Sequence, residues 1–99
     1  MDFNFYTYIL ASSKNGTLYI GVTRNLSKRV FQHKQGKASL FTKKYACVML
    51  VYYEGFLSAY DAICREKVLK KLYRFEKIDL IESVNPNWQD LYVHVAAAS

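Results

Sequence analysis

Hydrophobic and polar residues alternate along the first quarter of the chain in the pattern of two strands joined by a tight turn. Residues 3–10 are rich in aromatic and β-branched side chains, and residues 17–22 alternate between aliphatic and other side chains. Asn15-Gly16 lies between them and is a strong hairpin signal, because both residues tolerate a positive φ. A two-residue turn there would pair positions whose numbers sum to 31. Any pairing with an odd sum places three residues on one face of the sheet: Tyr8, Tyr19 and Gly21.

A helical period follows this hairpin. Asn25 can cap a helix that continues to about Gln35, and Gly36 can end it. Leu26 and Val30 form the inward stripe of this helix. Two chemically capable side chains lie one turn apart at the border of the stripe, Arg29 and His33.

The second half of the chain predicts one strand and two helices. Residues 47–53 are almost continuously apolar, which favours a strand covered on both faces, placed centrally or beneath helices. The clearest helical pattern extends from Ser58 to Tyr73 with Ser58 as its N-cap, and a shorter helix is expected over Phe75–Ser83. The apolar stripe of the longer helix comprises Ala59, Ala62, Ile63, Leu69, Leu72 and Tyr73.

The remaining segments are expected to be irregular. Residues 36–44 predict a basic loop, and residues 85–88, Asn-Pro-Asn-Trp, end the regular structure. Residues 93–99 lack both periodicity and charge, which predicts a disordered tail. The prediction is therefore one domain over residues 1–92, followed by that tail.

The composition points to an anionic partner. The chain has 99 residues with a formal net charge of +6. Nucleic acid is favoured over a membrane, because no basic amphipathic helix has a broad apolar face and nothing is long enough to span a bilayer. Cys47 and Cys64 lie inside apolar runs without CxxC spacing, so we expect buried free thiols in a reducing compartment, the cytoplasm.

Glu66 is the most informative single residue, because it falls within the apolar stripe of the second helix. An ionised carboxylate there is costly unless a cation or hydrogen bonds compensate it. One explanation is an ordinary ion pair with Lys70, four residues on. The other is a divalent cation such as Mg²⁺, held by one carboxylate together with substrate phosphate and waters.

The other candidate side chains also have structural explanations. Arg29 could pair with a carboxylate, His33 could be a surface or capped residue, and strand tyrosines such as Tyr8 and Tyr19 generally pack. A tyrosine also titrates near ~10, so its use as a base requires positive charge nearby. Together, two phenols, a basic helix edge and a carboxylate could activate water, balance phosphate charge and bind a metal.

The chain resembles the GIY-YIG nucleases of the small stand-alone type over roughly residues 5–92. Tyr19-Ile20-Gly21 is the second name-giving motif in literal form, and Tyr6-Thr7-Tyr8 occupies the position of the first. The remaining motif positions follow in the family's order: Arg29, His33, Glu66 within Arg65-Glu66-Lys67, and the asparagine region of residues 85–88.

This resemblance implies an α+β (α/β) fold with a β-β-α-β-α core and a three-stranded antiparallel sheet flanked by helices. It also implies one divalent ion, Mg²⁺ or Mn²⁺, held by Glu66 during phosphodiester hydrolysis. Tyr8 or Tyr19 would activate the attacking water, with Tyr8 favoured. Arg29 would stabilise developing negative charge, and His33 would assist proton transfer or orient the phosphate.

The chain departs from the family pattern at two places. Tyr6 and Thr7 replace the glycine and isoleucine of the first motif, and the bulk of Tyr6 opposes close substrate approach there. The closing asparagine is either Asn85 or Asn87, and we favour Asn85.

The implied substrate is DNA, where a structured or damaged site would be cut or nicked during repair or recombination. Sequence-specific cutting by this chain alone is not expected, and a partner protein could target it. Backbone phosphates would contact basic side chains: Lys37, Lys43, Lys44, Lys67, Lys70 and Lys71. The alternatives are a nucleic-acid-binding module that has lost useful catalysis and a plain interaction domain.

Overall fold

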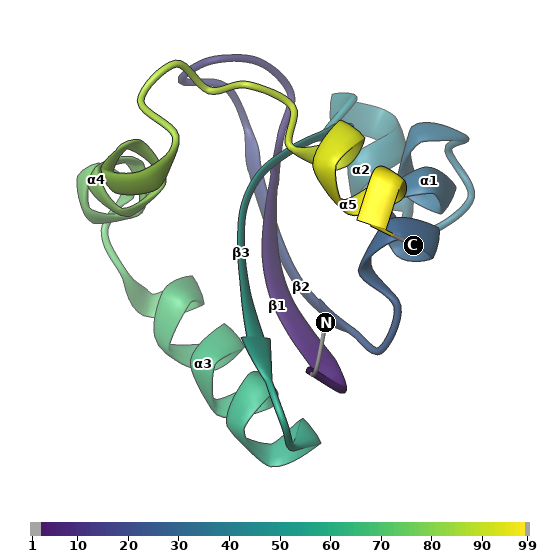
Figure 1. Cartoon of the computed structure of the whole chain (residues 1–99). Coiled ribbons are helices and arrows are strands. Elements are labelled where there is room, and N and C mark those ends of the chain that lie inside the picture. The colour runs from purple at the N-terminus through teal and green to yellow at the C-terminus, as the bar shows by residue number, and fades with distance from the viewer. Residues whose placement is uncertain (1–2, 99) are drawn as a thin grey trace.

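A three-stranded antiparallel sheet forms the centre of the computed structural model, which describes residues 3–98 (Figure 1). The strand order is β2-β1-β3. Helices α3 and α4 lie on one side of the sheet, and α1, α2 and α5 lie on the other. The α+β fold with a β-β-α-β-α core is therefore confirmed. The elements are β1 (Phe5–Ala11), β2 (Leu18–Thr23), α1 (Leu26–Lys34), α2 (Leu40–Tyr45), β3 (Met49–Phe56), α3 (Ala59–Lys71), α4 (Arg74–Val84) and α5 (Tyr92–Ala98).

The β1–β2 hairpin keeps the predicted face but not the predicted register. Tyr8 pairs with Gly21, so paired numbers sum to 29 instead of 31, and the connection spans residues 12–17. The backbone N–H of Ser12 donates to the carbonyl of Thr17, and Asn15 adopts the left-handed conformation with φ of 59°. A shift of two in the sum preserves which side chains share a face, so Tyr8, Tyr19 and Gly21 lie together as expected.

Strand β3 lies at the edge of the sheet and not at its centre, which corrects one of the two predicted placements. Its pairing with β1 shifts between Ile9 and Leu10, and this bulge turns both Val51 and Tyr52 toward one core while Leu50 faces the other. Both faces are thus covered, as the apolar run predicted. The outer edge is protected at Leu50, whose N–H donates to Asp90 and whose carbonyl accepts from the N–H of Leu91.

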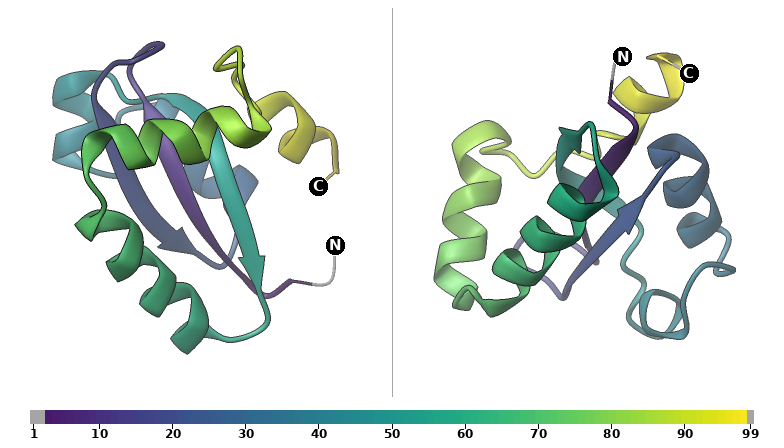
Figure 2. Two further views of the ribbon diagram at one scale, coloured as in Figure 1. Left: turned by 90° about the vertical axis from the view of Figure 1, so that its left-hand side faces the viewer. Right: turned by 90° about the horizontal axis from the view of Figure 1, so that it is seen from below.

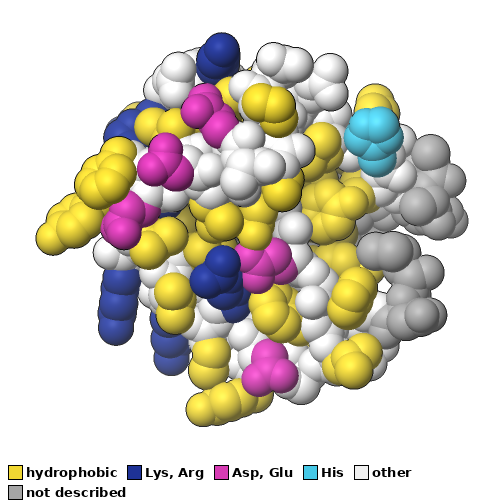
Figure 3. Space-filling view, turned by 60° about the vertical axis from the view of Figure 1, so that its left-hand side comes forward, with side chains coloured by type: hydrophobic (Ala, Val, Ile, Leu, Met, Phe, Trp, Pro, Cys, Tyr) yellow, Lys and Arg dark blue, Asp and Glu magenta, His cyan; other side chains and the backbone are white. Residues whose placement is uncertain are grey.

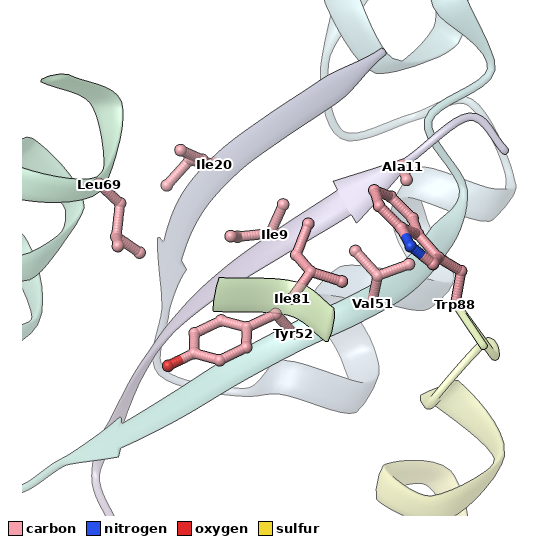
Figure 4. Packing of buried hydrophobic residues seen from close by; sticks show 8 residues of the cluster. All are labelled: Ile9, Ala11, Ile20, Val51, Tyr52, Leu69, Ile81 and Trp88. Atoms are coloured by element: carbon pink, nitrogen blue, oxygen red, sulfur yellow. The ribbon is translucent and has the colours of Figure 1, made fainter. Parts of the chain in front are cut away.

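Two separate cores form on the two faces of the sheet (Figure 2). The core beneath α3 and α4 is hydrophobic and includes Leu69 from α3, Ile81 from α4 and Trp88 (Figure 4). The core beneath α1 contains Leu26 and Val30, which confirms the predicted inward stripe of that helix. The partners of these two residues include Tyr6, Tyr8, Leu10, Cys47 and Leu50.

Helix ends follow the predicted caps closely. The Asn25 side chain accepts from the Lys28 N–H, and Gly36 has φ of +72° just beyond α1. Ser58 caps α3 by accepting from the Asp61 N–H. The structure ends α3 at Lys71, two residues earlier than predicted, and α4 extends one residue beyond the prediction at each end.

The predicted apolar stripe of α3 is only partly correct. Ala62 and Leu69 are buried, whereas Ile63 is 42% and Tyr73 is 73% exposed. The buried line of the helix therefore passes through residues 62, 66 and 69, which places Glu66 on it.

Two segments predicted as irregular are helical. Within the basic segment 36–44, Ser39 caps α2 by accepting from the Thr42 N–H, so this stretch is a loop followed by a short helix. The predicted disordered tail, residues 93–99, instead contributes to α5 as far as residue 98, because Tyr92 and Val95 pack against the α1 core. Ser99 lies outside the described residues.

The cysteines differ in their surroundings. Cys47 is buried as predicted, but Cys64 is exposed on α3, because the apolar run around it belongs to the outer side of that helix. Over the described part of the chain, none of the helices has the length and apolar character needed to cross a bilayer.

Candidate active site

Tyr8 and Gly21 form the floor of the candidate site. The Tyr8 ring lies across β2 so closely that a Cβ added to Gly21 would come within 2.6 Å of the phenol oxygen. Any side chain at position 21 would therefore displace the Tyr8 hydroxyl. The glycine of the Tyr-Ile-Gly motif is needed here for close approach, since its φ is not in the left-handed region.

His33 lies against this phenol. It comes from α1, is 1% exposed, and its Nε2 atom is 2.9 Å from the Tyr8 Oη atom. The sequence placed His33 at the border of the buried face, and the structure places it fully inside. A buried imidazole must satisfy both of its nitrogens, so the partner of Nδ1 decides its chemistry.

Thr42 of α2 supplies that partner, with its Oγ1 atom 2.8 Å from His33 Nδ1. The single hydroxyl hydrogen of Thr42 is donated to the carbonyl of Ser39 at 3.2 Å. With the hydroxyl hydrogen assigned to that carbonyl, we infer that Thr42 accepts the Nδ1–H of His33, which leaves Nε2 unprotonated and able to accept from Tyr8. Hydrogen bonds thus lead in one direction from Tyr8 through His33 and Thr42 to the Ser39 carbonyl.

The protonation states agree with this direction. Burial, assisted by the positive charge of Arg29, lowers the pKa of His33 to about 4, so the imidazole is neutral at pH 7. Burial and the neighbouring Tyr19 raise the pKa of Tyr8 well above its ordinary value, although Arg29 opposes that rise. Tyr8 is therefore a neutral phenol at pH 7.

Arg29 is a half-buried cation beside this pair, one turn before His33 on α1. Its charge reaches both Tyr8 and His33, as their pKa values show. Within the part of the chain that the structure describes, no carboxylate forms an ion pair with it. A guanidinium in this state is suited to bind a phosphate.

Tyr19 completes an aromatic wall on the same face. Its ring centroid lies 5.3 Å from that of His33 and 6.4 Å from that of Tyr8. On its other side it is 5.9 Å from the exposed ring of Phe41. Tyr19 thus lies between the buried hydrogen-bond chain and the surface.

Glu66 reaches this region from α3, which is fixed to the sheet one turn earlier. The Thr7 hydroxyl donates to the carbonyl of Ala62 at 2.8 Å, and Arg65 donates twice to the carboxylate of Glu54 on β3. Burial alone would raise the pKa of Glu54, but hydrogen bonds from Arg65 and Tyr52 hold it below its ordinary value. The neighbours of Glu66 are therefore well anchored.

The Glu66 side chain is 21% exposed and forms an ion pair with Lys70 at 3.1 Å. This pair is the ordinary structural explanation offered by the sequence. The carboxylate is nevertheless close enough to Tyr8 for its negative charge to contribute to the raised pKa of that phenol. Lys70 and Tyr19 also line one hollow, which places Glu66 at the same edge of β2 as the rest of the site.

The residues present fit a hard divalent ion. Among the described residues, no three His, Cys, Asp or Glu side chains come together as a ligand set. A single half-buried carboxylate does fit Mg²⁺ or Mn²⁺, which keep several waters and take further ligands from phosphate. Glu66 is the residue that would hold such an ion, in competition with Lys70.

Asn85 does not join the site. It is 4% exposed, and its amide donates to the carbonyls of Val51 and Gln89 and accepts from the Gln89 N–H. These bonds hold the turn before Trp88 against β3, so Asn85 has a structural role there, and Asn87 is exposed. The structure thus brings five predicted residues to one region: Tyr8, Tyr19, Arg29, His33 and Glu66. It leaves Asn85 apart from them.

The predicted phosphate-binding lysines are all exposed. Three lie on α3 and three lie on α2 or just before it, so they occupy both sides of the sheet. Figure 3 shows the side that carries α3 and α4, where acidic side chains are interspersed with hydrophobic ones and basic side chains lie mainly along one edge. The group on α3 comprises Lys67, Lys70 and Lys71, and the group on or before α2 comprises Lys37, Lys43 and Lys44.

Two residues that hydrogen-bond within or beside the candidate site are not predicted by the sequence. Thr42 lies in the segment predicted to be a basic loop, and Thr7 is a departure from the first motif. The spacing Ser39-x-x-Thr42, with a hydroxyl residue just before two hydrophobic ones, is a helix N-cap signal that could have indicated α2. Nothing local could have indicated that Thr42 contacts His33.

Comparisons with known proteins give matches over most of the chain. The model of the GIY-YIG catalytic domain matches residues 4–79. A UPF0213 protein of Clostridium perfringens is 42% identical over 78 residues, covering 79% of this chain and 83% of its own length. A UPF0213 protein of Oceanobacillus iheyensis is 37% identical over 82 residues, covering 83% and 94%. No solved structure matches the chain.

Proposed function

Because the chain belongs to the GIY-YIG family, whose domains are typically nucleases, we propose that it is a divalent-metal-dependent endonuclease that hydrolyses phosphodiester bonds of DNA. The observation that carries this proposal is the unpaired Arg29 guanidinium beside the Tyr8–His33 hydrogen bond. This arrangement places a cation that can bind phosphate next to a chain of hydrogen bonds that can accept a proton. We further propose structured or damaged DNA as the substrate, in repair or recombination.

The proton path follows the tautomer of His33. The oxygen of the attacking water forms a bond to phosphorus while its proton moves to Tyr8 Oη, and the phenol proton moves to His33 Nε2. Thr42 holds the Nδ1–H throughout, so Nε2 stays directed at Tyr8. The bond from phosphorus to the leaving deoxyribose oxygen breaks, and that oxygen takes a proton from solvent water. Tyr8 thus relays the proton and does not have to ionise, which its raised pKa opposes.

Arg29 stabilises the charge that develops on the phosphorane oxygens. A phosphate bound there also offsets the guanidinium charge that helps to lower the pKa of His33, so the imidazole becomes a better acceptor when DNA is bound. When bound at Glu66, a divalent ion supplies further positive charge to a phosphate oxygen. Glu66 would hold that ion in place of the Lys70 ammonium, and Lys70 would then be free to contact the DNA backbone.

A second candidate function is DNA binding without useful catalysis. The observation that favours it is the Glu66–Lys70 pair, because a carboxylate already neutralised by a lysine binds a metal less readily. Exposed pairs of this i,i+4 type are worth only a few tenths of a kcal/mol, which is less than a metal ion gains on a carboxylate and phosphate together. The geometry therefore favours the nuclease.

One assay separates these functions. Supercoiled and branched DNA are incubated with the protein and Mg²⁺ or Mn²⁺, alongside the Arg29→Ala and Glu66→Ala variants. We expect the wild type to cut, and Arg29→Ala to cut about 10²–10³-fold more slowly. Lys28→Ala is the matched control, because it removes the same charge from an exposed position one residue away. Binding without cutting by the wild type would establish the second function, and cutting that survives Glu66→Ala would exclude that residue as the metal ligand.

A further inference from the structure

A hollow of about 320 Å³ opens beside the candidate site at the free edge of β2. Its lining combines Leu18, Tyr19 and Ile20 of the strand with Phe41 of α2, Lys70 of α3 and Lys77 of α4. Helix α2 lies on one side of the sheet, and helices α3 and α4 lie on the other (Figure 2). Side chains from all three helices line the hollow. One side of it is aromatic and the other is basic.

The aromatic side continues onto the surface. Phe41 is 41% and Tyr45 is 43% exposed, and their ring centroids are 4.8 Å apart. With Tyr19 they form a row of three rings that starts next to His33 and ends in solvent. The ammonium of Lys44 lies 5.2 Å from the Tyr45 ring, which adds positive charge to the outer end of the row.

The basic side is connected to the site as well. Lys70 contacts the carboxylate of Glu66, and Lys77 lines the same hollow as Phe41. An occupant of the hollow would thus have an apolar, ring-lined surface on one flank and two ammonium groups on the other. This combination matches a nucleobase joined to its phosphate.

We propose that this hollow binds an unpaired nucleobase of the DNA substrate, stacked on Phe41, with the adjoining phosphate held by Lys70 and Lys77. The proposal rests on the proposed function and narrows its substrate to DNA that has an unpaired base next to the cut. Bases within a duplex are stacked and paired, so they cannot enter a hollow of this kind without being extruded. Its volume lies at the lower end of the range for small-ligand sites, which suits one base rather than a helix.

The test measures binding without cleavage, in chelator, with fluorescently labelled oligothymidylate and a blunt duplex of the same length. We expect tighter binding of the single strand, and a loss of roughly 5- to 100-fold for single strand alone in Phe41→Ala. Phe75→Ala is the matched control, since Phe75 is an exposed ring stacked on Tyr73 on α4. Phe41→Trp should restore single-strand affinity, which excludes a general folding defect as the cause.

The outcomes separate this inference from the proposed function. If Phe41→Ala lost affinity for the single strand and the duplex equally, or for neither, the base-binding hollow would be overturned even if the protein cuts DNA. Phe41-dependent single-strand binding by a wild type that never cuts would support the hollow and overturn the nuclease. A wild type that prefers duplex would also overturn the hollow.

Discussion

The two faces of the sheet show how one small scaffold separates stability from chemistry. The face beneath α3 and α4 is closed by aliphatic side chains such as Ile9, Leu69 and Ile81. The face beneath α1 and α2 buries a phenol, an imidazole and a threonine hydroxyl, each of which has a hydrogen-bond partner. Buried polar groups without partners are costly, so the chemistry of the second face depends on a complete hydrogen-bond chain, whereas the first face is held mainly by apolar packing.

The largest expected effect is on catalysis at the polar face. Tyr8→Phe removes the hydroxyl that relays the proton and leaves His33 Nε2 without its donor. We expect the cleavage rate to fall about 10²–10⁴-fold, the range for general acid–base groups, while DNA binding is retained. Single-turnover cleavage and binding in chelator would be measured side by side. If Tyr8→Phe cut DNA as fast as the wild type, Tyr8 would not be part of the proton path.

The reverse pattern is expected at the apolar face. Ile81→Ala empties space in the core beneath α3 and α4, which does not include Tyr8, Arg29 or His33, and should lower the free energy of unfolding by about 2–5 kcal/mol. Cleavage per folded molecule should stay unchanged at low temperature. Val30→Ala on the opposite face, next to Arg29 on α1, is the comparison, and we expect it to reduce both stability and cleavage. Urea unfolding with activity normalised to folded protein checks both variants.

The two faces should also respond differently to acid. The pKa of His33 is lowered to about 4 in the folded protein by burial and by Arg29, so protons bind the unfolded chain first. The neutral His33 therefore adds to the free energy of unfolding, on the order of 3 kcal/mol. This stabilisation is fully present above the unfolded-state pKa of histidine, near ~6.5, and is lost as the pH falls from there to about 4. Urea unfolding of wild type and His33→Gln between pH 7 and pH 4 tests this. If the free energy of unfolding fell equally with pH in the two proteins, this prediction would be wrong.

A smaller effect is expected at Thr42. Thr42→Val keeps the shape but leaves the buried Nδ1–H of His33 without an acceptor, at a cost of about 1–3 kcal/mol. The imidazole should then favour the other tautomer, which NMR of the ring nitrogens would show directly. Thr42→Ser retains the hydroxyl and should restore both the tautomer and the cleavage rate. A merely structural Thr42 would leave the tautomer unchanged in Thr42→Val.

The parts of this comparison that the sequence could predict are those set by local periodicity. The face shared by Tyr8 and Gly21 was correct although the hairpin register was not, because the period of a strand is two and the error was also two. The predicted caps at Asn25 and Ser58 are correct because each depends on a single side chain that the sequence shows directly. Glu66 was found because a charge on an apolar stripe is visible without a structure.

The parts that escaped prediction depend on contacts between distant segments. The edge position of β3 requires the bulge near Val51 and its cover by Asp90 and Leu91, which lie about 40 residues further along the chain. The exposure of Cys64 depends on which side of α3 meets the sheet. The tautomer of His33 depends on Thr42, which no periodicity connects to it.

The shortness of α2 has a consequence for how the site opens and closes. Helices of six residues are not stable alone, so α2 depends on its Ser39 cap and its packing, and is expected to open locally more often than the core strands. Each opening event would withdraw Thr42 from His33 and Phe41 from Tyr19 together. Hydrogen exchange at the α2 amides would therefore report the fraction of molecules that are ready to react, and a mutation that loosens this one surface turn would slow catalysis without touching a reacting group.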